Sequence, residues 1–161
     1  MNKIWILAVF VAGLINLGAA ERPAVERVPD FTLTDLEGRK VRFSSFQNKV
    51  VLLNFWATWC PPCQDEIPSL KALYSQYKSK GVEVIGIALD DEGVGAVKPF
   101  VQMQKINYPI FIGDNGAIKA LGGIRGIPTT FLISRDSRII KKYVGEQRRS
   151  DFEVGIEKLI G

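Results

Sequence analysis

The chain has 161 residues, 47% of them hydrophobic, and a formal net charge of +4 at pH 7. This length can bury one good core and is too short for two ordinary domains, so we expect a single domain. The chain contains no histidine, which excludes Ser-His-Asp and Cys-His nucleophilic sites and histidine-ligated zinc or haem. The mild charge and the lack of a nucleic-acid motif predict no nucleic-acid partner.

The first 20 residues have the pattern of a secretory signal. Lys3 precedes an apolar stretch, Ile4 to Ala20, that ends in three small residues. We expect export from the cytoplasm, to a periplasmic or other extracytoplasmic location, with cleavage after Ala20. An uncleaved membrane anchor at residues 4–20 is the alternative, although 17 residues interrupted by Asn16 reach only the lower limit of a span. We expect residues 21–29 to be a polar linker and residues 30–161 to be the folded domain.

The first half of this domain predicts a hairpin and then two buried strands joined by a helix. Phe31–Thr34 and Val41–Phe43 are short strands on either side of a turn at Gly38. Val50–Phe55 is continuously apolar, which is typical of a central strand buried on both faces. Val82–Leu89 has the same character and should run parallel to it, because a helix connects the two. The apolar residues of that helix recur at helical spacing up to a stop at Gly81: Ile67, Leu70, Leu73, Tyr74 and Tyr77.

The second half alternates shorter elements. A helix carries Val97, Phe100 and Val101 and is weakened in its first turns by Pro99. The remaining predicted elements are a strand at 108–112, a short helix at 117–121, a hairpin of 129–133 and 139–144 that turns at Asp136-Ser137, and a helix from an N-cap at Ser150 to Ile160. This order predicts an α/β sandwich built on a mixed sheet.

The only two cysteines, Cys60 and Cys63, lie where the first buried strand gives way to its helix. A disulfide between them closes so short a loop that it stabilises the fold little, so we interpret the pair as a dithiol that is oxidised and reduced. Cys60, at the helix entrance and with its sulfur at the surface, is the predicted nucleophile, because the helix N-terminus lowers a thiol pKa from about 8.5. Cys63 is the predicted resolving thiol. Pro61 and Pro62 form a stiff active-site loop.

Two segments carry a resemblance to a known family. Residues 54–63 (NFWATWCPPC) followed by Glu66-Ile67-Pro68, and residues 126–131 (GIPTTF), resemble the exported TlpA/ResA/CcmG-like branch of the thioredoxin superfamily. The resemblance implies a thioredoxin-like three-layer sandwich, with an N-terminal β-hairpin extension and an inserted crossover. It also implies that Ile127-Pro128 is a cis-proline loop facing the dithiol, with Ile127 pairing with substrate and Pro128 beside the sulfurs.

Other residues near the cysteines carry their own expectations. Glu66 matches an acidic residue that ResA-like proteins place near the dithiol, where it would raise a thiol pKa and exchange protons. The alternative for Glu66 is a solvated glutamate in the first helical turns. Trp59 is expected to flank and shield the site, and Trp56 to belong to the core. Asn54 replaces the buried aspartate of thioredoxin and is expected to be a structural polar group.

The resemblance implies an extracytoplasmic thiol-disulfide oxidoreductase. It would act on protein disulfides, reducing them, with apocytochrome c as the implied substrate and a membrane electron-donor thiol protein as partner. No cofactor beyond the Cys60/Cys63 disulfide and no metal site are expected. The alternatives are a general disulfide oxidant, a Cu(I)-binding protein, and a structural disulfide. A peroxidase is disfavoured because Ala57 stands where peroxiredoxins place threonine.

Overall fold

The computed structural model describes residues 27–161. The predicted signal or anchor and most of the predicted linker therefore lie outside the described residues. The strands are β1 (Thr32–Asp35), β2 (Lys40–Arg42), β3 (Val50–Trp56), β4 (Val82–Ala88), β5 (Ile110–Ile112), β6 (Thr129–Ile133) and β7 (Ile139–Val144). The α-helices are α1 (Pro61–Tyr77), α2 (Val94–Met103), α3 (Asn115–Ala120) and α4 (Arg149–Ile160), and short 3-10 helices lie at Phe43–Phe46 and Lys78–Lys80.

The strands form one seven-stranded mixed sheet in the order β2-β1-β5-β4-β3-β6-β7. β3 pairs in parallel with β4, and β4 in parallel with β5, whereas β6 and β7 run antiparallel to their neighbours. The N-terminal hairpin joins the same sheet, because β1 pairs with β5 and places Thr34 opposite Ile112. The predicted mixed sheet, N-terminal hairpin and inserted crossover through α2 and β5 are confirmed.

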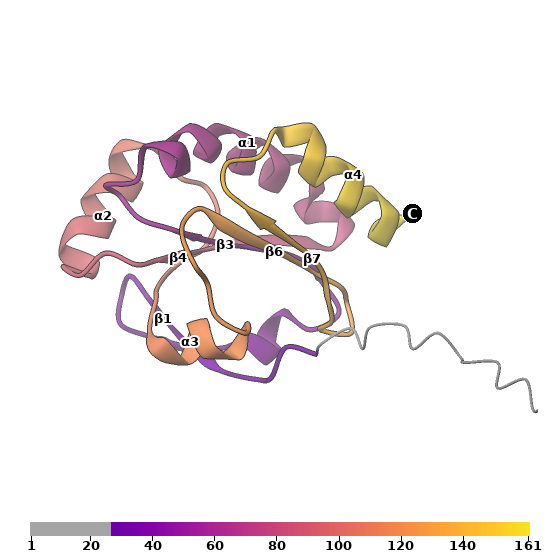
Figure 1. The fold of residues 1–161 in the computed structure, drawn as a ribbon, viewed down its shortest axis with the longest axis horizontal. Helices are drawn as coiled ribbons and strands as arrows, with labels where there is room; N and C mark the ends of the chain where they lie inside the picture. The colour runs from indigo at the N-terminus through magenta and orange to yellow at the C-terminus, as the bar shows by residue number, and fades with distance from the viewer. Residues whose placement is uncertain (1–26) are drawn as a thin grey trace, which may run out of the picture.

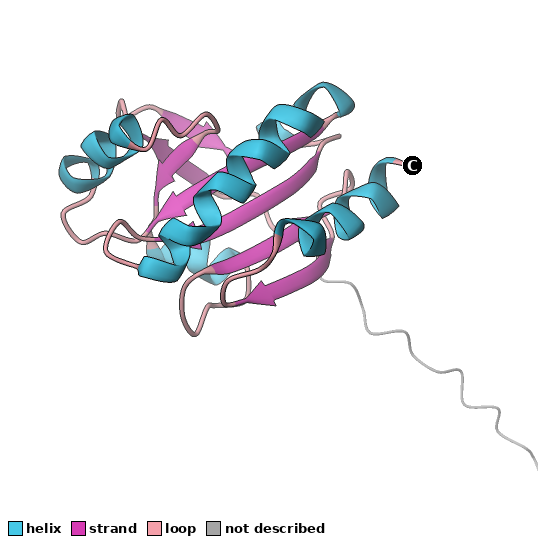
Figure 2. Cartoon of the chain, turned by 90° about the horizontal axis from the view of Figure 1, so that it is seen from above, coloured by secondary structure: helices cyan, strands magenta, loops and turns pink. Residues whose placement is uncertain are grey.

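Helices cover both faces of the sheet and make three layers. α1, α2 and α4 lie over one face and α3 lies under the other (Figure 1), and the view from above shows α1 and α4 lying over the strands (Figure 2). Side chains of β3 point alternately to the two faces. Leu52 packs in the core beneath α1 and α4, while Leu53 packs in the core on the α3 side.

β3 is the interior strand that carries the chain into α1. All seven of its residues are buried, as its continuous apolar sequence predicts. The side chain of Trp56, at its end, packs against Gly86 of β4, where only glycine leaves room for it: a Cβ atom at Gly86 would lie 2.9 Å from the Trp56 Nε1 atom and 2.6 Å from the Cδ1 atom of Ile110. The predicted core position of Trp56 is thus made possible by the glycine on the next strand.

Several details differ from the sequence-based expectations. The predicted strand at 108–112 is limited to Ile110–Ile112, and the predicted helix at 117–121 lies at Asn115–Ala120. The domain begins before residue 30, because the Val28 side chain is only 5% exposed and its N–H donates to the Ser137 carbonyl at 2.8 Å. Ser150 does not cap α4. The N-cap is Arg148, whose N–H donates to the Asp151 carboxylate at 3.2 Å. The predicted helix that carries Val97 and Phe100 is confirmed as α2, which begins at Val94 and continues through Pro99.

None of the helices within residues 27–161 has the length and apolar character needed to cross a membrane.

Candidate active site

The two cysteines form a disulfide at the first turn of α1. Cys60 is the N-cap residue and Cys63 lies one turn later, with their Cα atoms 5.3 Å apart. Pro61 and Pro62 occupy the first helical positions, where a missing N–H leaves no intrahelical hydrogen bond unmade. The turn is closed by the N–H of Gln64, which donates to the Cys60 carbonyl at 3.1 Å. The sequence thus fixes the placement of the disulfide locally.

The disulfide is less exposed than its place at a helix end predicts. Cys60 is only 4% exposed and Cys63 is also buried, because both pack in the core cluster that contains Trp56 and Ile67. The expectation that the outer sulfur lies at the surface is therefore wrong for the oxidised form. Trp59 is 64% exposed, so it flanks the disulfide but projects into solvent instead of shielding it.

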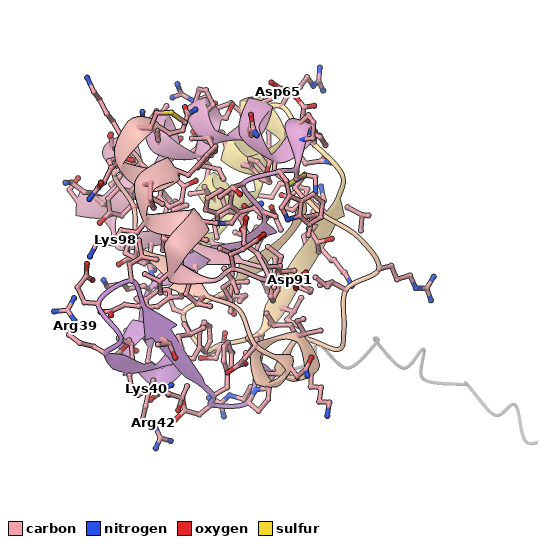
Figure 3. All side chains as sticks on the ribbon, turned by 90° about the vertical axis from the view of Figure 1, so that its left-hand side faces the viewer. Arg39, Lys40, Arg42, Asp65, Asp91 and Lys98 are labelled. Carbon is pink, nitrogen blue, oxygen red and sulfur yellow. A yellow bond between two sulfur atoms is a disulfide. The ribbon has the colours of Figure 1, made fainter. Side chains whose placement is uncertain are left out.

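An aspartate two residues after β4 holds the loop that leads into the disulfide. The Asp90 carboxylate accepts hydrogen bonds from the Thr58 N–H, at 3.1 Å to each oxygen, and from the Thr58 hydroxyl. Asp90 itself is buried. Sequence reasoning missed this contact, because Asp90 is 32 residues beyond Thr58 and its only local signal is its place after a buried strand. Figure 3, which looks onto this side of the molecule, labels Asp91, the residue that follows Asp90.

Glu66 lies on the disulfide-bearing face of α1, one turn after Cys63, and is only 1% exposed. Its carboxylate accepts a hydrogen bond from the Asn54 side-chain amide at 3.0 Å and from the Gln147 N–H at 2.9 Å. The Asn54 amide also donates to the Thr130 hydroxyl at 2.8 Å. The solvated-glutamate alternative is therefore wrong, and Asn54 is more than a structural polar group because it orients this carboxylate.

Burial raises the pKa of Glu66 from 4.5 to about 7. The hydrogen bond from the Gln147 N–H opposes this rise, the nearby charge of Glu146 adds to it, and the hydrogen bond from Asn54 again lowers the pKa. Glu66 can therefore gain or lose a proton near neutral pH, as a proton-exchanging group beside a dithiol requires.

The proline segment before β6 reaches the same site. The Ile127–Pro128 peptide bond is cis, as the resemblance implies, and Ile127 packs against the core cluster that contains Cys60 and Cys63. The Pro128 carbonyl accepts a hydrogen bond from the Gly145 N–H at 2.8 Å. The segment after β7 therefore contacts both the proline loop, through Gly145, and Glu66, through Gln147.

The described residues offer no metal centre of ordinary composition. Within residues 27–161, no group of three or more histidine, cysteine, aspartate and glutamate side chains is placed to hold a metal ion. The chemistry of the site is that of its two sulfurs and the carboxylate behind them.

The disulfide joins two cysteines separated by two residues, at the first turn of the helix that follows an interior strand. A cis-proline segment packs close to it. This arrangement defines a thioredoxin-like redox protein. The comparisons with known proteins agree. The chain belongs to the Redoxin family, whose model matches residues 23–156.

The relatives are thiol-disulfide oxidoreductases. The chain is 40% identical over 134 residues to the thiol-disulfide oxidoreductase ResA of Bacillus thuringiensis subsp. konkukian (strain 97-27), covering 83% of this chain and 77% of that protein. The crystal structure of a thiol:disulfide interchange protein of the thioredoxin family from Chlorobium tepidum TLS matches with a TM-score of 0.76 at 32% identity, covering 84% and 96%. A secreted thiol-disulfide isomerase from Corynebacterium glutamicum matches with a TM-score of 0.76 at 28% identity, covering 83% and 84%.

The fold, the disulfide and these relatives agree on one activity. The protein is a thioredoxin-like thiol-disulfide oxidoreductase of the ResA type, and its substrates are thiols and disulfides of proteins.

Proposed function

We propose that this protein works outside the cytoplasm and reduces disulfides in target proteins through Cys60 and Cys63. The observation that carries the proposal is the buried Cys60–Cys63 pair with the buried carboxylate of Glu66 one helical turn behind it.

The reaction consists of two thiol exchanges. The Cys60 thiolate attacks the target disulfide, so that a Cys60–target bond forms and the first target sulfur leaves as a thiolate that takes up a proton. The Cys63 thiolate then attacks the Cys60 sulfur, which forms the Cys60–Cys63 disulfide and releases the second target thiol. The target gains two electrons and the protein loses two. A reduced dithiol of a membrane electron donor restores the protein by the same steps in reverse.

The surroundings of the sulfurs support a reductant. A reduced dithiol is a strong reductant when its thiolate is not stabilised, because thiolate stabilisation favours the reduced form. The positive end of the α1 dipole stabilises a Cys60 thiolate. Burial of both sulfurs and the negative charge of ionised Glu66 oppose it. Burial and the Glu66 charge both disfavour the thiolate, and this supports the proposal of a potential toward the reducing end.

Glu66 has a proposed role as a proton acceptor and donor. Cys63 must lose its proton before it can attack the mixed disulfide, and a carboxylate with a pKa of about 7 can take that proton at neutral pH. Ile127 has the proposed role of pairing with an extended target peptide, and Trp59 that of an exposed apolar contact beside it. Both flank the disulfide, and the exposed Trp59 side chain is accessible to a bound target protein.

Location and substrate are proposed on separate grounds. The signal pattern of residues 1–20 and the similarity to a protein described as secreted support an extracytoplasmic location. Apocytochrome c, with its cysteine pair kept reduced for haem attachment, is the proposed target class on the resemblance to the TlpA/ResA/CcmG-like branch.

A trapping experiment combined with a reduction potential tests the proposal. In the full-length protein, Cys63→Ser should accumulate mixed disulfides with exported target proteins, among them apocytochromes c, and Cys60→Ser should accumulate none. Equilibration of the wild-type dithiol against defined thiol buffers should give a potential near the thioredoxin value of about −270 mV. A value near that of DsbA, about −120 mV, would make the protein an oxidant instead.

A further inference from the structure

The end of the molecule opposite the disulfide brings together segments that are far apart in the sequence. The Asn48 N–H donates to the Arg135 carbonyl at 3.1 Å, and the Val50 N–H donates to the Gly81 carbonyl at 3.0 Å. Arg27 pairs through its backbone with Arg138. In Figure 1 the start of the described chain, the turn between β6 and β7 and the C-terminus all lie on the right-hand side, while α1 begins on the left. The seven residues of β3 separate this end from the disulfide by roughly 20 Å.

This end is strongly basic. We call it the basic pole and define it by six side chains: Arg27, Lys78, Lys80, Arg135, Arg138 and Lys158. Two exposed carboxylates lie among them, and the buried carboxylate of Glu83 at the same end is paired with Lys49 at 2.6 Å. Asp136 is paired with Arg138 at 2.7 Å, and Glu157 accepts a hydrogen bond from the Tyr77 hydroxyl at 2.9 Å. Within the described part of the chain, Arg135 and Lys80 form no ion pair with a carboxylate. The pole therefore presents net positive charge to solvent.

A hollow in the basic pole suits a phosphate group. Its volume is about 310 Å³, and it is lined by Arg27, Gln47, Asn48, Arg135, Asp136 and Ser137. Two guanidinium groups and neutral amide and hydroxyl groups are donors that can bind phosphate oxygens. The negative charge of Asp136, which also lines the hollow, is offset by its ion pair with Arg138 at 2.7 Å. A second hollow of about 240 Å³ shares Arg27, Gln47 and Ser137 with the first.

The chain leads from this pole toward its apolar N-terminal stretch. Six residues separate Ala20 from Arg27, and the seven Cα–Cα steps between these two residues span at most about 25 Å when extended. If residues 4–20 remain in a bilayer, Arg27 cannot lie farther than this from its surface. The opposite end carries the exposed carboxylates of Asp65 and Asp91 (Figure 3), which an anionic surface repels.

We propose that the basic pole binds the phosphate headgroups of anionic phospholipids, so that the domain is held with its disulfide turned away from the membrane. Basic side chains beside a membrane-inserted segment are attracted to anionic lipids over about a Debye length. The proposal rests on the extracytoplasmic location proposed above and on the alternative in which residues 4–20 are retained as an anchor instead of being cleaved. It is independent of the thiol chemistry.

Lysine labelling in nanodiscs tests the proposal. The full-length protein is placed in discs of phosphatidylcholine alone or with phosphatidylglycerol, and the rate at which an amine-reactive ester modifies each lysine is measured by mass spectrometry. We expect Lys78, Lys80 and Lys158 to be modified several-fold more slowly in the anionic discs. Lys40 and Lys98, both of which face the viewer's side in Figure 3, should be modified at the same rate in both.

Two charge-reversal variants distinguish binding through the basic pole from a general electrostatic attraction between the protein and anionic discs. Arg27→Glu/Arg135→Glu should lose the protection of the pole lysines, and Lys40→Glu/Lys98→Glu should keep it. Equal labelling rates in both kinds of disc, or protection that survives in the first variant, would overturn the proposal. So would equal protection by millimolar inorganic phosphate in zwitterionic discs, which would assign a soluble-anion site. Thiol exchange measured on the same discs reports the proposed function separately, and it should not change between the variants.

Discussion

The carboxylate of Glu66 accepts a hydrogen bond of 2.9 Å from the N–H of Gln147, a residue 81 positions later in the chain. The same short segment sends the Gly145 N–H to the Pro128 carbonyl. The loop after β7 therefore contacts two groups of the site, the buried carboxylate of Glu66 and the cis-proline segment. The charge on Glu66 is consequently coupled to the backbone around the site as well as to the thiols.

Replacing Glu66 should change how stability depends on pH. The pKa of Glu66 is raised from 4.5 to about 7 on folding, so the folded protein binds more protons than the unfolded chain between these values. The free energy of unfolding should therefore fall as the pH rises through this window, by about 3 kcal/mol. Glu66→Gln should lack this fall. Urea denaturation of the oxidised protein at pH 5 and pH 8 measures it, and parallel curves for variant and wild type would contradict the buried position.

The same variant should change the reactivity of the reduced dithiol. Removal of a neighbouring negative charge stabilises a thiolate, so Glu66→Gln should lower the pH at which Cys60 is alkylated by about one unit. Asp65→Asn is the matched control, because Asp65 is exposed and adjacent in sequence, and it should leave the profile nearly unchanged. Rates of iodoacetamide modification between pH 5 and 10 provide the measurement. An identical profile in both variants would remove Glu66 from the proton chemistry.

Gly86 should not tolerate a methyl group. A Cβ atom there would press against Trp56 and Ile110, and such overpacking costs about 1–3 kcal/mol. Gly95 in α2 is the control, since a Cβ atom at that position meets nothing within 4 Å, and Gly95→Ala should stabilise by about 0.5–1 kcal/mol. Thermal unfolding of the two variants decides the point. Equal melting temperatures would show that the contact between β3 and β4 adapts freely.

Asp90 should be needed to position the loop before the disulfide. Asp90→Ala leaves the Thr58 N–H and hydroxyl without their acceptor, which should cost about 1–3 kcal/mol of stability. It should also slow the reaction of the dithiol with a protein disulfide, because Thr58 lies only two residues before Cys60. Asp91→Ala, an exposed neighbour, is expected to change neither quantity. Denaturation and insulin reduction, measured side by side, test both effects.

Trp59 should matter for protein substrates and hardly for stability. An indole that is 64% exposed loses little packing when truncated, so Trp59→Ala should change the free energy of unfolding by less than about 0.5 kcal/mol. Reduction of a protein disulfide should slow, since the variant lacks an apolar contact beside Cys60, while reaction with a small disulfide reagent should not. Met103→Ala, another exposed apolar residue, serves as control. Equal slowing with both substrates would assign Trp59 a role in the chemistry itself.

Short-range patterns were sufficient for most of the fold. The hairpin of β6 and β7 was predicted with its boundaries, because alternation and the turn at Asp136-Ser137 lie within 16 residues of each other. The continuous apolar character of Val50–Phe55 identified an interior strand. The N-cap of α4 was misplaced because Ser150 has the preferred residue type, whereas the observed cap depends on the Asp151 carboxylate reaching back to Arg148.

By itself, the sequence determined what depends on neighbours along the chain: a disulfide between Cys60 and Cys63, its place at the start of a helix, and the mixed α/β architecture. Only the tertiary structure decided what depends on distant segments. It buried Cys60 instead of exposing it, and it surrounded Glu66 with groups 12 and 81 residues away. It also gathered the basic pole from four segments. The physical reason is that burial and charge interact through space, and a residue's spatial neighbours are set by how the sheet and helices pack.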